Sequence, residues 1–104
     1  MEHCVAVRGA GRVELPAYGL TDAEHQVEKE IRTLWPEAAV EVTGVERLDG
    51  ASRIVEEFRV SYRVRGLVAV DASGADDARK AALRLLRDRF ADSRFARIAW
   101  EPVG

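Results

Sequence analysis

Arginine side chains alternate with apolar ones in the stretch that ends at Arg65. Alternate residues of a strand point to the same side of a sheet, so Arg59, Arg63 and Arg65 are predicted to share one face. Arginines in such a row can bind phosphate or carboxylate groups through paired N–H donors. Arg8 and Arg97 are expected to join this row from neighbouring strands.

Acidic side chains are predicted on the same face. Glu14, Glu41, Glu57 and Glu101 all have the parity of the arginines in their own segments. A ladder of cross-strand ion pairs is therefore the simpler interpretation of the arginine row, and anion binding is the alternative.

The positions of the aromatic side chains indicate whether the arginine row could bind RNA. RNA-binding sheets stack bases on exposed aromatic residues. Here Phe58 and Tyr62 have the parity of the buried face, and only Phe95 is expected to face outward. The net charge of −2 gives no general attraction to nucleic acid. Nucleic acid is therefore not an expected partner, and RNA binding through the arginines stays an alternative.

A glycine-rich segment, Arg8-Gly9-Ala10-Gly11-Arg12, offers a second way to bind an anion. Flexible backbone amides between two guanidinium groups could cradle a phosphate, although a bulge or a tight turn is the simpler interpretation. With Arg12 added, the candidate anion-binding residues are Arg8, Arg12, Arg59, Arg63, Arg65 and Arg97.

This segment resembles the glycine-rich loop of acylphosphatases, and the resemblance implies a small phosphate-handling enzyme. In that family the loop leads directly into the first helix and an asparagine is catalytic. Here residues 13–16 intervene and the chain contains no asparagine. An enzyme is therefore the third candidate for the function, and no catalytic residue is assigned.

Metal and cofactor sites are not predicted. His3, Cys4 and His25 are the only histidine and cysteine residues. If His3 and Cys4 belong to a strand, they point to opposite faces and cannot easily bind one metal ion.

The elements that would position these residues begin with a strand and a helix. Alternating apolar residues from Val5 to Leu15 predict a first strand, interrupted at Gly9 to Gly11. Thr21 and Glu24 have the spacing of a capping box, which predicts the start of a helix that ends before Pro36.

A second strand is predicted at Val40 and Val42, followed by a turn at residues 48–52. A third strand is expected from about Arg53, with Ile54 on its buried face. A second helix is predicted over about 75–91. Arg89 is expected on the face that packs against the sheet, with its charged end extending to solvent. The last strand is expected over 95–100.

The two halves of the chain resemble each other at an offset of 55 positions. Gly19 aligns with Gly74 and Asp22 with Asp77, and the alignment extends without a gap to Glu46 and Glu101. This repeat predicts the order β-α-β-β-α-β. The expected fold is a ferredoxin-like α+β sandwich, with a four-stranded antiparallel sheet and two helices on one face. The expected organisation is a single domain over residues 1–104, with halves at about 1–48 and 53–104.

Composition narrows the function only broadly. No apolar run approaches the length of a membrane span, the N-terminus has no secretory pattern, and Cys4 has no disulfide partner, so we expect a cytoplasmic protein without a membrane partner. The arginine-rich composition is typical of bacterial nucleotide bias.

The helices differ in charge, with acidic residues in excess on the first and basic residues in excess on the second. Side-by-side packing of the helices within one chain is the simpler use of this difference, and attraction between subunits is the alternative. The second and fourth strands are expected at the sheet edges, where they could pair with another copy. The sequence thus predicts a non-enzymatic interaction or ligand-binding module, homodimeric, with a protein partner or a small ligand.

Overall fold

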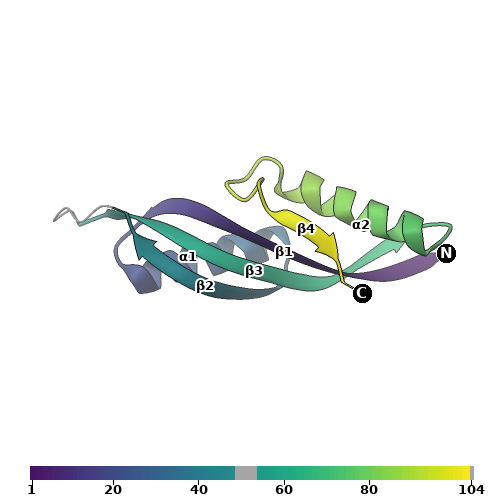
Figure 1. Ribbon diagram of the computed structural model, residues 1–104, viewed down its shortest axis with the longest axis horizontal. Helices are drawn as coiled ribbons and strands as arrows, with labels where there is room; N and C mark the ends of the chain where they lie inside the picture. The colour runs from purple at the N-terminus through teal and green to yellow at the C-terminus, as the bar shows by residue number, and fades with distance from the viewer. Residues whose placement is uncertain (49–53, 104) are drawn as a thin grey trace.

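The computed structural model of the chain describes residues 1–48 and 54–103. Six elements follow one another: β1 (Glu2–Ala17), α1 (Leu20–Leu34), β2 (Ala39–Arg47), β3 (Glu56–Asp71), α2 (Ala75–Phe90) and β4 (Ala99–Pro102) (Figure 1). The strands form one antiparallel sheet in the order β2-β3-β1-β4. The prediction of an α+β chain with a four-stranded antiparallel sheet and two helices is confirmed. Most of the predicted turn, from residue 49 on, lies outside the described residues.

The two long strands β1 and β3 form the spine of the molecule. They pair along their whole length, from Glu2 opposite Asp71 to Ala17 opposite Glu56. The prediction that Gly9 to Gly11 forms a bulge, a turn or a phosphate loop is wrong, because the register passes through this segment unbroken. The third strand starts later than predicted, and Ile54 is 83% exposed instead of buried.

Close packing explains the glycines of β1 and β3. A Cβ atom on Gly9 would lie 2.6 Å from the Trp100 ring, and one on Gly66 would lie 2.6 Å from the Trp35 ring. A Cβ atom on Gly11 would lie 2.7 Å from the hydroxyl oxygen of Tyr62. The glycines therefore make room for aromatic side chains and are not sites of unusual backbone.

Buried and exposed side chains alternate along both strands of the spine. In β1 the buried side chains are Val5, Val7, Val13, Leu15 and Ala17, and in β3 they are Phe58, Val60, Tyr62, Val64, Val68 and Val70. Both helices contact β1 and β3, so these residues form the face that the helices cover. The even-numbered residues of β1 and the odd-numbered residues of β3 form the opposite face, which we call the open face. Burial raises the pKa of Tyr62 to about 12.

The helices start differently from the sequence prediction. Gly19 is the N-cap of α1, and no side chain caps the helix, so the predicted capping box of Thr21 and Glu24 is wrong. Instead Asp22 accepts a hydrogen bond from the backbone N–H of Tyr18 at 2.9 Å. At the start of α2, Asp77 accepts one from the hydroxyl of Ser73 at 2.7 Å. Arg89 lies on the exposed side of α2 and does not extend from its inner stripe.

An approximate two-fold axis relates the halves of the spine. Gly9 pairs with Val64, 55 residues further along, so a rotation about this pair exchanges β1 with β3. Glu101 lies opposite Arg8, and Glu41 lies opposite Arg63, which is the counterpart of Arg8. The structural counterpart of Glu101 is therefore Glu41, and the gapless alignment with Glu46 is wrong.

A longer connection in the second half causes this difference. Residues 91–98 join α2 to β4, whereas only residues 35–38 join α1 to β2. Phe95 belongs to this connection and is buried against Tyr62, with ring centroids 5.5 Å apart. The expected outward-facing Phe95 and the early start of the last strand are therefore wrong.

The elongated shape follows from the length of the spine. The molecule measures 56 × 23 × 18 Å, and the helices lie at opposite ends of the sheet (Figure 1). Within the described residues α1 and α2 do not pack on each other, so the expected side-by-side packing is wrong. Arg94, in the connection before β4, reaches Glu30 of α1 at 3.2 Å.

Aromatic side chains fill the space between the helices. Trp35 and Trp100 meet edge to face with centroids 5.9 Å apart, and Phe90 lies 5.2 Å from Trp100. Burial of side chains of this size contributes about 3 kcal/mol each. This aromatic centre fixes β4 and the ends of both helices at the middle of the sheet.

Candidate functional site

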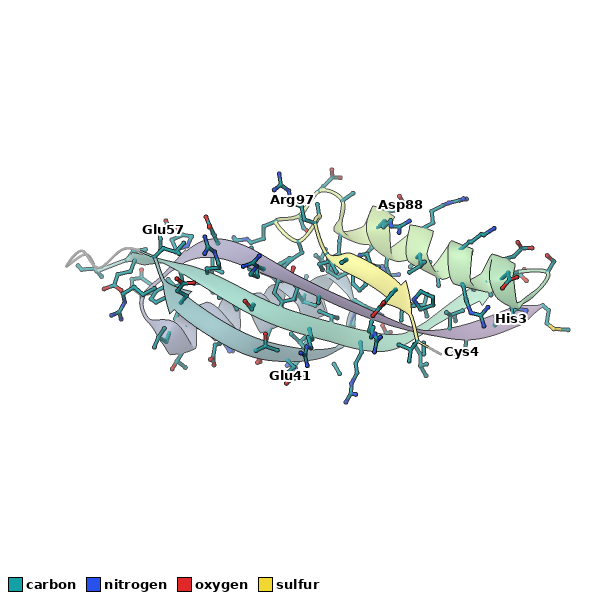
Figure 2. The ribbon with its side chains drawn as sticks, in the orientation of Figure 1. His3, Cys4, Glu41, Glu57, Asp88 and Arg97 are labelled. Atoms are coloured by element: carbon teal, nitrogen blue, oxygen red, sulfur yellow. The ribbon has the colours of Figure 1, made fainter. Side chains whose placement is uncertain are left out.

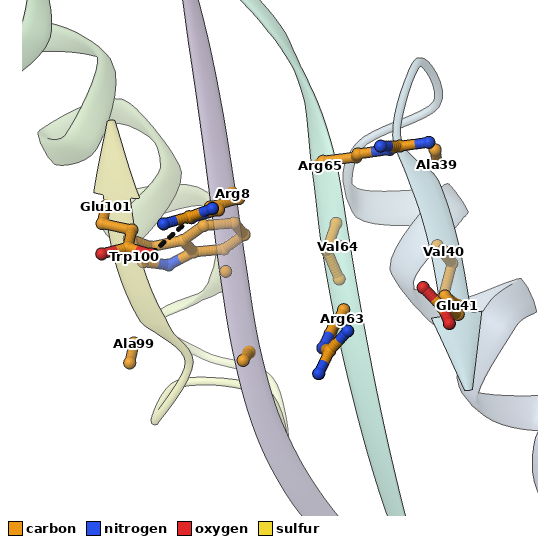
Figure 3. Close-up of a pocket in the computed structure, with 12 residues that line it drawn as sticks. Arg8, Ala39, Val40, Glu41, Arg63, Val64, Arg65, Ala99, Trp100 and Glu101 are labelled. Atoms are coloured by element: carbon orange, nitrogen blue, oxygen red, sulfur yellow. Dashed lines mark hydrogen bonds and ion pairs between the residues drawn. The ribbon is translucent and has the colours of Figure 1, made fainter. Parts of the chain in front are cut away.

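A groove crosses the middle of the sheet where all four strands run beside one another. It has a volume of about 830 Å³ and is lined by three residues from each strand, namely 8–10, 39–41, 63–65 and 99–101 (Figure 3). The approximate two-fold axis passes through it, since Gly9 and Val64 are both lining residues. We call it the central groove.

Three of the candidate arginines line the central groove, from the two middle strands. Arg8 comes from β1, and Arg63 and Arg65 come from β3. Arg8 forms an ion pair with Glu101 of β4, which Figure 3 marks with a dashed line. Neither Arg63 nor Arg65 forms an ion pair with any residue that the structure describes.

The surroundings of Arg65 are unfavourable for a cation. Its direct cross-strand neighbours are Arg8 on β1 and Ala39 on β2. Like charges directly opposite each other destabilise a sheet. Arg65 extends toward Ala39 in Figure 3, away from Arg8, and finds no carboxylate there. The direct cross-strand neighbours of Arg63 are Ala10 and Glu41, so no like charge lies opposite it.

The other three candidate arginines lie away from the central groove, around a second hollow. Arg12, Arg59 and Arg97 line it together with Glu14 and Arg94. Arg97 belongs to the connection before β4 and not to a strand, which corrects the sequence prediction. It lies beyond the sheet edge opposite to that of Glu41 (Figure 2). The sequence-predicted residues therefore form two groups of three.

Arg59 takes part in the predicted ladder of ion pairs. It donates to Glu14 at 2.9 Å and lies 3.6 Å from Glu46, its neighbours on β1 and β2. The hydrogen bond to Glu14 raises the pKa of Arg59; desolvation opposes this effect, and the charges of Glu14 and Glu46 add to it. Arg59 and Arg8 are thus ladder residues, with acidic partners already in place.

Sequence reasoning missed the small residues that open the central groove. Ala10, Ala39 and Ala99 lie between the charged side chains of the open face. Because their side chains are short, the space beside the arginines stays open. The sequence shows three alanines at open-face positions, but only the strand order reveals that they lie together in one groove.

The histidine and cysteine residues do not come together, and no metal site was predicted from them. His3 and Cys4 lie near the start of β1, whereas His25 lies in α1, which begins beside the other end of β1. Among residues 1–48 and 54–103, no group of three or more His, Cys, Asp and Glu residues could hold a metal ion.

Exposed aromatic rings are also scarce at the groove. Phe58, Tyr62 and Phe95 are all buried, and Trp100, which lines the groove, is 8% exposed and packed against Phe90.

No helix in the described part of the chain is long and apolar enough to cross a membrane. Comparisons with protein-family models, with curated proteins and with solved structures find no match to the chain.

Proposed function

We propose that the chain is a non-enzymatic ligand-binding module whose central groove binds a small ligand with carboxylate or phosphate groups. One observation carries this proposal: Arg65 lies directly opposite Arg8 and has no acidic neighbour across either strand. An anion bound there would supply the acidic partner that Arg65 lacks. Destabilising arrangements of this kind are typical of functional sites.

The spacing of the arginines indicates a ligand with more than one anionic group. Arg63 and Arg65 occupy alternate positions of β3, which are about 6.8 Å apart along a strand. A groove of about 830 Å³ lies within the range of small-molecule sites. Glu41 and Glu101 flank the arginines, and their charges would repel a long polyanion that extended past them. A compact dianion or trianion therefore fits better than RNA.

The same surroundings favour a small ligand over both RNA and catalysis. RNA recognition lacks support because the described aromatic rings do not form a stacking surface on the open face. The phosphate-handling enzyme lacks support because the glycine segment is a continuous strand.

We also propose that the arrangement is ferredoxin-like. The element order β-α-β-β-α-β supports this assignment, as does the strand order read from the β4 edge, β4-β1-β3-β2. The length of the spine and the separated helices distinguish it from a compact sandwich.

A cytoplasmic location is part of the proposal, since reducing conditions would keep the exposed thiol of Cys4 from being oxidised.

Calorimetric titration with citrate, pyrophosphate and a single-stranded RNA oligonucleotide tests the proposed function. We expect citrate or pyrophosphate to bind with one-to-one stoichiometry and the RNA not to bind. Replacing both unpaired arginines, Arg63→Gln with Arg65→Gln, should weaken binding at least about tenfold, because each charge-assisted hydrogen bond contributes roughly 1.5–3 kcal/mol.

A matched control keeps the net charge change the same. Arg84→Gln with Arg87→Gln removes two exposed arginines of α2 that lie outside the groove, and should leave the affinity unchanged. Equal weakening of the affinity in the control would mean that the loss comes from the change in net charge and not from the groove. No binding of either small anion, or tight RNA binding that depends on Arg63 and Arg65, would contradict the proposal.

A further inference from the structure

Each strand of the spine extends beyond the shorter strand beside it. β2 pairs with β3 only as far as Arg65, so residues 66–71 of β3 have no strand on their outer side. β4 pairs with β1 only as far as Ala10, so residues 11–17 of β1 are left in the same situation. The approximate two-fold axis relates these two free edges, which makes them a matched pair.

The free edge of β1 is protected. Val103 donates its backbone N–H to the carbonyl of Ala6, so even-numbered residues of β1 point their backbone groups outward. Along the free edge these are Arg12, Glu14 and Pro16. Charged side chains discourage pairing with another strand, and proline has no N–H to donate.

A side chain from α1 completes this protection. The carbonyl of Pro16 accepts a hydrogen bond from the amide of Gln26 at 3.3 Å. The last outward backbone acceptor of this edge is therefore already engaged. In the second half, Ala81 stands at the position that corresponds to Gln26, and alanine cannot make such a bond.

The free edge of β3 has neither a proline nor a capping amide, and its one charged residue, Asp71, lies at its end and is paired with the N-terminal amino group. Leu48 donates its backbone N–H to the carbonyl of Glu57, so odd-numbered residues of β3 point outward, and along the free edge these are Leu67, Ala69 and Asp71. Within residues 1–48 and 54–103, no backbone hydrogen bond uses their outward groups. Leu67 is 60% exposed and stands where the other half has Arg12, and Ala69 stands where it has Glu14. This edge presents unpaired donors and acceptors, flanked by apolar side chains at Leu67 and Ala69.

We propose that residues 67–71 of β3 pair antiparallel with the same residues of a second copy, about a two-fold axis at Ala69. In this register Ala69 faces Ala69 of the other copy and Leu67 faces Asp71, so every outward N–H and C=O of the segment finds a partner. Val68 faces Val70 on the side that the helices cover, which keeps that face apolar. The two sheets become one continuous sheet. None of these residues lines the central groove, so the dimer and the proposed ligand site can fail independently.

Measurement of the mass in solution tests the dimer. We expect sedimentation or light scattering to give twice the chain mass of 11.5 kDa at high concentration. Leu67→Arg copies the residue of the protected edge, and Ala69→Pro removes an outward N–H that has no backbone partner among the described residues, so both variants should be monomeric. Leu20→Arg makes the same chemical change at an exposed leucine of α1 and should stay dimeric. Circular dichroism establishes that each variant is folded.

Cross-linking tests the register. In a Cys4→Ser background, Ala69→Cys should form a covalent dimer on mild oxidation, because directly paired residues of an antiparallel ladder have Cα atoms about 5.5 Å apart, within disulfide range. Leu67→Cys should not, since it faces Asp71 of the other copy. A monomeric wild type at all concentrations, a folded Leu67→Arg that remains dimeric, or cross-linking at residue 67 equal to that at residue 69 would each overturn the proposal.

Discussion

Arg65 is the residue whose surroundings depart furthest from what stability alone would favour. Its neighbours across the sheet are another arginine and an alanine. Arg59 belongs to the same row of β3, yet it is held by glutamates on both sides. The difference between them separates a residue that stabilises the sheet from one that is available to a ligand.

Replacement of Arg65 should therefore stabilise the ligand-free protein. We expect Arg65→Gln to raise the free energy of unfolding by about 0.2–1 kcal/mol, because it removes the like charge opposite Arg8. Chemical denaturation at low salt measures this, and added salt should narrow the gap by screening the repulsion in the wild type. Arg59→Gln is the contrasting variant, and it should lower the stability. A loss of stability in Arg65→Gln would show that the side chain has a favourable partner.

Gly66 tests the close approach between the sheet and the aromatic centre. Gly66→Ala should lower the free energy of unfolding by about 1–3 kcal/mol, since the new methyl group would overlap the buried Trp35 ring, which is itself held against Trp100. The gain from a less flexible unfolded chain, about 0.4–1 kcal/mol, offsets only part of this loss.

The control for this variant is another glycine of the sheet. A Cβ atom on Gly44 of β2 would have no atom within 4 Å, so Gly44→Ala should be close to neutral or slightly stabilising. Equal effects of the two substitutions in thermal or chemical denaturation would mean that the Trp35 ring moves aside at little cost.

At the scale of elements, the helix starts depend on aspartates and not on the threonine and glutamate that the sequence indicates. Asp22→Ala should destabilise the protein by about 0.5–2 kcal/mol, because it leaves the Tyr18 N–H without its acceptor and removes a negative charge from the first turn of α1. Glu24→Ala, which removes the residue of the predicted capping box, should have little effect. Denaturant midpoints of the two variants compare these roles directly, and a larger loss in Glu24→Ala would favour the capping box.

The limits of sequence reasoning are clearest in the connections between elements. Alternation of apolar residues located β1 and β3 because each strand buries one complete face against the helices. The same pattern misplaced Phe95, since a buried residue in an irregular segment has no periodicity to reveal it. It also treated Gly9 and Gly11 as a break, because a glycine that accommodates a distant aromatic ring looks locally like a turn residue.

The candidate site was predictable in part. The parity of β3 placed Arg63 and Arg65 on one face, but the lack of an acidic neighbour at Arg65 depends on its pairing with Arg8 and Ala39. The assignment of partners also requires the length of residues 91–98, which shifts Glu101 relative to its apparent counterpart. No periodicity within one strand contains this information.

At the scale of the whole molecule, the approximate two-fold symmetry is what makes the two edges of the spine comparable. One half carries charge, proline and a capping glutamine along its free edge, and the other carries Leu67, Ala69 and a terminal Asp71 at the matching positions. The symmetry also places the central groove at the only stretch of the described sheet where four strands lie side by side. The proposed ligand site and the proposed dimer edge thus lie on different parts of one repeated structure.

The order of the strands has a further consequence for how the chain is made. β2 pairs with β3 and not with β1, so the first half contains no two strands that are neighbours in the sheet. As the polypeptide emerges from the ribosome, its N-terminal half must wait for β3 before any ladder can form, and the outermost pair joins Glu2 to Asp71. Contacts between such distant parts of a sequence slow folding. The chain should therefore acquire its sheet late in synthesis.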